Sequence, residues 1–166
     1  MFLELIAVFV AGFAGAGATL LLARLTGGRL PRWIVPLGAG AAMLAATISS
    51  EYSWFSRTSQ ALPDSMTVAE TGTSRALWRP WTYAFPLTDR FVAVDTGGLR
   101  ANTQQESLYL ADLYFFGRWQ PVQSVEVMVD CAEGQRADPA LGDGSPPVWR
   151  DVGPDDGIVR TVCAQV

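Results

Sequence analysis

The chain has 166 residues, of which 49% are hydrophobic and 17% are charged, and its mean hydropathy is +0.20. An average globular protein is about 25% charged, so this deficit indicates a membrane protein. All 12 basic residues are arginine and there is no histidine, which excludes Ser-His-Asp and Cys-His nucleophiles, histidine-ligated metals and lysine-dependent cofactors. We therefore expect no enzymatic activity, no metal ion and no other cofactor.

Charge is distributed unevenly along the chain. Residues 1–50 carry three arginines and one acid, a net charge of +2, whereas residues 51–166 carry nine arginines and fifteen acids, a net charge of −6. The negative part would repel a phosphate backbone, and its arginines are scattered singly. Nucleic-acid binding is therefore not expected.

The first fifty residues predict a hairpin of two transmembrane helices. Residues 5–23 and 33–50 are uncharged, and the first of these segments would span about 28 Å as a helix, close to the thickness of the hydrocarbon core. The short loop of residues 24–32 makes the helices antiparallel neighbours. A cleaved signal peptide is the alternative for the first segment, but such peptides begin with positive charge and this chain begins with Glu4.

The same loop predicts the orientation in the membrane. It holds three arginines and no acid, so the positive-inside rule places it in the cytoplasm. The N-terminus and residues 51–166 are then expected in the periplasm of a Gram-negative cell, with the hairpin in the lipid bilayer of the inner membrane.

Small residues recur along both helices and predict close helix packing. Such residues let membrane helices approach each other, so these faces either serve only to pack the two helices together or also dock one face on another membrane protein. The predicted packing positions are Ala7, Ala11, Gly12, Gly15, Ala16, Gly38 and Ala42.

The rest of the chain predicts a connector over residues 51–65 and a small, mainly antiparallel β domain over residues 66–166. The signals are short apolar or alternating runs separated by Gly, Pro and Asp. We expect strands at residues 66–70, 91–94, 107–116, 122–131, 148–150 and 158–163, and largely loop over residues 134–157. Residues 107–116 also permit a helix, because their apolar spacing fits neither period cleanly.

The two cysteines, Cys131 and Cys163, both lie in the region expected to be periplasmic. An oxidising compartment favours a structural disulfide between them over two free thiols. A redox-active pair is disfavoured because there is no Cys-x-x-Cys spacing.

Two acidic patterns are candidates for catalytic or metal sites. Asp95, Thr96 and Gly97 resemble the aspartic-protease signature, but the chain has one copy and the chemistry needs two aspartates, so a strand-ending turn is the better interpretation. Several acids crowd a loop-rich stretch without the spacing of a calcium loop, which favours a solvated loop. They are Asp138, Asp143, Asp151, Asp155 and Asp156.

An aromatic segment at residues 76–86 is the most distinctive pattern. It combines four aromatic residues, an arginine and two prolines, which suits either core packing or a recognition surface, because Trp, Tyr and Arg dominate binding hot spots. The predicted partner-binding residues are Trp78, Arg79, Trp81, Tyr83, Arg118 and Trp119.

Three stretches of the chain together resemble small, uncharacterised alphaproteobacterial inner-membrane proteins with two N-terminal transmembrane helices and a periplasmic domain. These stretches are residues 30–55, 76–81 and 116–122. The resemblance covers about half of the chain. It implies a location and no activity.

Two non-enzymatic functions follow as expectations, and an enzyme that uses carboxylates alone, such as one acting on glycans, is a third hypothesis. The first is a non-enzymatic accessory subunit or assembly factor that docks on a larger inner-membrane complex, respiratory or photosynthetic. The alternative is a membrane-anchored periplasmic module that binds or senses a small ligand.

Overall fold

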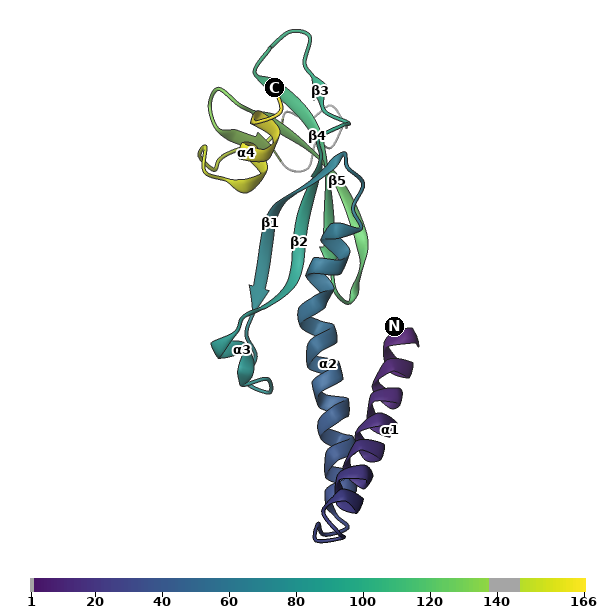
Figure 1. Cartoon of the computed structure of the whole chain (residues 1–166). Helices are drawn as coiled ribbons and strands as arrows, with labels where there is room; N and C mark the ends of the chain where they lie inside the picture. Colours follow the sequence, from purple (N-terminus) through teal and green to yellow (C-terminus); the bar gives the residue numbers. More distant parts are fainter. Residues whose placement is uncertain (1, 138–146) are drawn as a thin grey trace. The chain divides into compact units, whose positions relative to one another are not determined.

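The computed structural model describes residues 2–137 and 147–166. The chain forms two compact units, Met1–Trp54 and Phe55–Val166. The first is a helical hairpin and the second is a small antiparallel β domain, which confirms the predicted fold class (Figure 1).

The helical hairpin consists of α1 (Phe2–Leu25) and the first part of α2 (Ile34–Gln60). Helix α1 ends in a glycine turn: Gly27 and Gly28 have φ angles of 66° and 76°, a left-handed conformation that glycine adopts without steric cost. Both helices are long and apolar enough to cross a membrane. Their outward side chains are large and apolar, and lipid would cover them; examples are Leu5, Phe9, Phe13, Leu21, Leu37 and Leu44.

The two helices approach most closely at glycines. A β carbon added to Gly15 would stand 2.5 Å from the Cβ of Ala42 and 2.7 Å from the carbonyl oxygen of Gly38, and one added to Gly12 would stand 2.7 Å from the Cε of Met43. The absence of side chains at these positions therefore sets the distance between the helices. Among the other predicted packing positions, Ala11 and Ala16 are half-buried, whereas Ala7 is exposed.

Helix α2 continues to Gln60, through most of the stretch predicted as a connector. Residues 51–60 contain no proline or glycine, and the next proline along the chain is Pro63. Because a proline disfavours helical geometry in the residue before it, the helix ends shortly ahead of it.

The β domain contains one antiparallel sheet of seven strands within the described residues, in the order β1-β2-β4-β5-β6-β7, with β3 paired to β4. The strands are β1 (Met66–Ser74), β2 (Leu87–Asp95), β3 (Arg100–Ala101), β4 (Leu108–Gly117), β5 (Gln120–Asp130), β6 (Gln135–Ala137) and β7 (Trp149–Asp151). Residues 107–116 are thus mostly strand, not helix. β7 lies within one residue of the strand predicted at 148–150, and β6 is an additional short strand in the stretch predicted as largely loop.

Each face of the sheet is covered by a different element. One face, called the α4 face below, packs against helix α4 (Gly157–Cys163). Its core consists of Val94, Ala111, Leu113, Val127 and Val129 from the sheet with Ile158, Val159 and Val162 from the helix. The opposite face, called the Phe55 face, carries Phe91, whose ring stacks on Phe116 with centroids 4.7 Å apart and meets Phe55 edge-on at 5.4 Å.

Helix α4 corrects the prediction of a strand at residues 158–163. The Asp156 carboxylate accepts hydrogen bonds from the N–H groups of Ile158 and Val159, each at 3.1 Å, and so caps the helix. Ile158, Val159 and Val162 follow helical spacing and are all buried. Burial on the sheet and the cap therefore outweigh the strand preference of β-branched residues.

The predicted disulfide is present. Cys131 directly follows β5 and Cys163 is the last residue of α4, and their Cα atoms are 5.7 Å apart. The bond therefore ties α4 to the end of the strand beneath it.

Replacing Gly15 by Ala is expected to destabilise the helical hairpin by about 1–3 kcal/mol, because the new methyl group would meet a backbone oxygen and a neighbouring Cβ. Gly17→Ala is the matched control, since a β carbon there meets nothing within 4 Å. Thermal unfolding of the full chain in mild detergent measures both. Equal effects of the two variants would contradict the close approach at Gly15.

Removing the disulfide with Cys131→Ser and Cys163→Ser is expected to cost about 3–4 kcal/mol of unfolding free energy, the chain-entropy value for a loop of this length. Denaturant unfolding of the oxidised and variant chains measures the difference. A change below about 1 kcal/mol would show that α4 is held by packing alone.

Candidate functional site

The aromatic segment leaves the sheet at the same end as the turn between β4 and β5. Ser74, which ends β1, pairs with Leu87, which begins β2. Arg90 of β2 pairs with Gly117, the last residue before the turn. The N–H of Arg118 donates to the carbonyl of Asp89 at 3.0 Å. The aromatic segment and the β4–β5 turn, which are far apart in the sequence, are thus held at neighbouring positions of β2.

Four of the predicted partner-binding residues line one pocket of about 200 Å³. They are Trp78 and Arg79 from the aromatic segment and Arg118 and Trp119 from the turn. Asp89 lines the same pocket. The arrangement joins aromatic surface, two arginines and one carboxylate in a small space.

The other two predicted residues, Trp81 and Tyr83, lie on the short helix α3 (Trp81–Ala84) and do not line this pocket. Trp81 is half-buried and Tyr83 is exposed. The structure therefore gathers four of the six residues and places the remaining two beside them in the chain.

Thr82 holds the aromatic segment in shape. Its side chain is 1% exposed, donates to the carbonyl of Arg79 at 2.7 Å and accepts from the N–H of Ala76 at 3.0 Å. A backbone bond from the Arg79 N–H to the Ala76 carbonyl closes the turn. These bonds order the segment before any partner binds, which lowers the entropic cost of binding.

The large apolar side chains at this end are exposed. Trp78 is 78% and Trp119 is 55% exposed, and the guanidinium carbon of Arg118 lies 4.9 Å from the centre of the Trp119 ring. Leu77, Tyr83 and Phe85 are also exposed. The recognition-surface interpretation therefore fits the geometry of this segment better than core packing does.

A second cavity, called the groove below, lies at the same end of the sheet. Its volume is about 380 Å³, and it is lined by residues of β1, β2, β4 and β5 that include Glu70, Gly72, Arg90, Val92, Phe115 and Gln123. This site was not predicted from the sequence. Alternation alone could not have found it, because a register shift between Val68 and Glu70 in β1 brings Glu70 to the face of Arg90.

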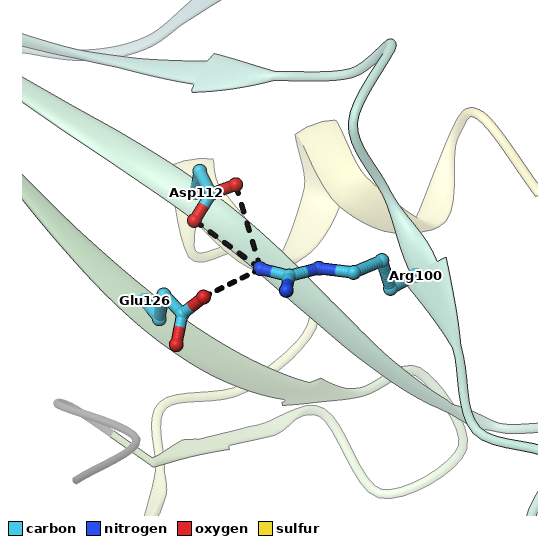
Figure 2. A network of polar contacts seen from close by, with 3 residues as sticks. All are labelled: Arg100, Asp112 and Glu126. Carbon is cyan, nitrogen blue, oxygen red and sulfur yellow. Dashed lines mark hydrogen bonds and ion pairs between the residues drawn. The ribbon is translucent and has the colours of Figure 1, made fainter. Parts of the chain in front are cut away.

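Arg100, Asp112 and Glu126 form a polar cluster on the opposite face from α4 (Figure 2). Asp112 and Glu126 are directly opposed on β4 and β5. Arg100 on β3 donates to Glu126 at 2.6 Å and lies 3.4 Å from Asp112. The hydrogen bond to Glu126 raises the pKa of the Arg100 guanidinium, so it stays charged and bridges two like charges. This arrangement stabilises strand pairing.

Two of the acidic residues considered above, Asp95 and Asp156, have structural roles. The Asp95 carboxylate accepts from the N–H of Gly97 at 3.1 Å, and Thr96 donates through its hydroxyl to the carbonyl of Ser65 at 2.8 Å, as a strand-ending turn requires. Asp156 caps α4 and pairs with Arg136 at 3.3 Å. Asp138 and Asp143 lie outside the described residues. Within the described residues, no group of three or more potential metal ligands comes together.

Replacing Arg100 by Gln is expected to lower the melting temperature of the chain, because Asp112 and Glu126 would then repel each other unbridged. The loss should shrink at high salt, which screens exposed charges. Glu126→Gln in the same chain should recover stability, and Arg160→Gln on the exposed side of α4 is the control. A loss that neither salt nor the second substitution reduces would contradict this role.

No protein-family model, curated protein or solved structure matches this chain, so the candidate sites stand on their geometry alone.

Proposed function

We propose that this protein is a non-enzymatic accessory subunit or assembly factor that docks on a larger membrane-protein complex. One observation carries the proposal: Trp78, Arg79, Arg118 and Trp119 converge on one pocket, with both tryptophans exposed. Tryptophan and arginine supply most of the binding energy in many protein interfaces. The stiff segment that presents them favours a preformed docking surface.

The location belongs to the same proposal. Three arginines lie in the loop between α1 and α2, which favours a cytoplasmic loop and a periplasmic β domain in a bacterial inner membrane. The disulfide supports an oxidising compartment for that domain. A respiratory or photosynthetic complex of that membrane is the partner we propose.

The helical hairpin offers a second contact to such a partner. Gly17 and Gly40 are exposed, and a β carbon added to either would meet nothing within 4 Å. Small residues not used between α1 and α2 are therefore available to a helix of the partner.

A second function is favoured by the groove. Its volume of about 380 Å³ is within the range of small-molecule sites. A membrane-anchored module that binds or senses a small ligand accounts for an open cavity that a purely structural subunit does not need.

Truncating both pocket tryptophans, Trp78→Ala with Trp119→Ala, should reduce co-purification with the partner complex at least about tenfold, as expected when interface hot spots are lost. A tagged copy is purified from native membranes in mild detergent, and the co-migrating complex is quantified. Val148→Ala with Val166→Ala is the control, because both valines are exposed and neither lines the pocket. Undiminished co-purification of a correctly folded double variant would refute docking through this surface.

A further inference from the structure

The groove has an apolar floor that continues the domain core. Val92 and Phe115 are cross-strand partners, two residues along from the buried partners Val94 and Leu113. Side chains two residues apart share a face of a sheet, so all four belong to the α4 face. Leu113 is 1% exposed whereas Phe115 is 39% exposed. The same apolar surface is therefore buried where α4 lies on it and open where the groove begins.

Arg90 lies along one wall of the groove. It pairs with Gly72 across β1 and β2. A β carbon added to Gly72 would stand 2.5 Å from both the Cγ and the Nε of Arg90. The arginine side chain therefore lies across the space that a side chain at position 72 would fill, which keeps its guanidinium at the groove.

Glu70 supplies the opposite charge on the same face. It pairs with Val92, so it is a diagonal neighbour of Arg90, with Cα atoms about 7–8 Å apart. Its stem packs against the start of α4, since a β carbon added to Gly157 would stand 2.6 Å from the Cγ of Glu70. Arg90 is thus packed against Gly72, and Glu70 is packed against Gly157.

The two charges do not neutralise each other. Within the described residues, neither Glu70 nor Arg90 makes a hydrogen bond or ion pair through its side chain. Both are exposed and both line the groove. A ligand could therefore use one donor group from β2 and one acceptor group from β1 above an apolar floor.

We propose that the groove binds a small zwitterion with an apolar body, of the class of α-amino acids with apolar side chains. The Arg90 guanidinium receives the ligand carboxylate through parallel N–H donors, and the Glu70 carboxylate receives the ammonium group. Val92 and Phe115 contact the apolar side chain, and the Gln123 amide completes the wall. This inference rests on the second function proposed above and is independent of docking through the aromatic segment.

The test is calorimetric titration of the full, disulfide-bonded chain in mild detergent with L-leucine and L-phenylalanine. Three analogues each remove one feature: 3-methylbutylamine lacks the carboxylate, 4-methylpentanoate lacks the ammonium group, and glycine lacks the apolar side chain. We expect at least one of the two amino acids to bind and each analogue to bind about tenfold or more weakly, because each loses a charged hydrogen bond or the apolar contact.

Variants of the groove identify the residues involved. Arg90→Gln and Glu70→Gln should each weaken binding about tenfold or more. Gly72→Ala should also weaken it, although both charges remain, because Arg90 must move. Arg160→Gln and Glu106→Gln are the matched controls, since both residues are exposed and neither lines the groove, and they should leave binding unchanged.

Three results would overturn the inference. They are no binding of either amino acid at millimolar concentration to a folded chain, equal binding of the single-charge analogues, and equal losses in the groove and control variants. If the amino acids fail to bind while the tagged chain still co-purifies with a complex, the ligand-binding function falls and the docking function stands.

Discussion

The β domain depends on the packing of α4 over only part of one sheet face. The helix is short, so its three buried apolar side chains, Ile158, Val159 and Val162, cover the core around Leu113 and leave Phe115 exposed. Asp156 caps the start of the helix and pairs with Arg136 of β6 at 3.3 Å, and Cys163 fastens the other end to Cys131 at the end of β5. Because both ends of α4 are fixed, the helix cannot slide along the sheet, and the remainder of that face stays open.

This constraint leaves the groove open on the α4 face, whereas the β1–β2 and β4–β5 connections put the aromatic pocket at the same end of the sheet. Neighbouring residues of β2 serve the two sites: Asp89 lines the aromatic pocket and Arg90 lines the groove. Side chains of adjacent residues point to opposite faces of a strand, so the two cavities are close in the chain yet separated by the sheet. A ligand in the groove and a partner at the aromatic segment would therefore contact the same stretch of β2 from its two sides.

Much of the fold could be predicted from composition and periodicity. Uncharged runs of membrane-spanning length predicted both helices, and valine alternation predicted β5, because these signals are local. The strand predicted at residues 158–163 was wrong because the burial of α4 depends on a sheet that is distant in the sequence. The convergence of Trp78 with Trp119 required the register of β2 and β4, although the residue types already marked both segments. The groove was missed for the same reason: Glu70 and Arg90 become neighbours only through the pairing of β1 with β2.

Hydrogen–deuterium exchange of the oxidised and reduced chain, resolved by residue, tests the central role of α4 most directly. Reduction of the Cys131–Cys163 bond is expected to speed exchange in α4 and in the strand segments around Leu113, Val127 and Val129. Exchange in the segment of β2 and β4 that carries Phe91 and Phe116 should change little, because Phe55 covers it independently. A uniform increase over the whole sheet, or no change in α4, would contradict the account.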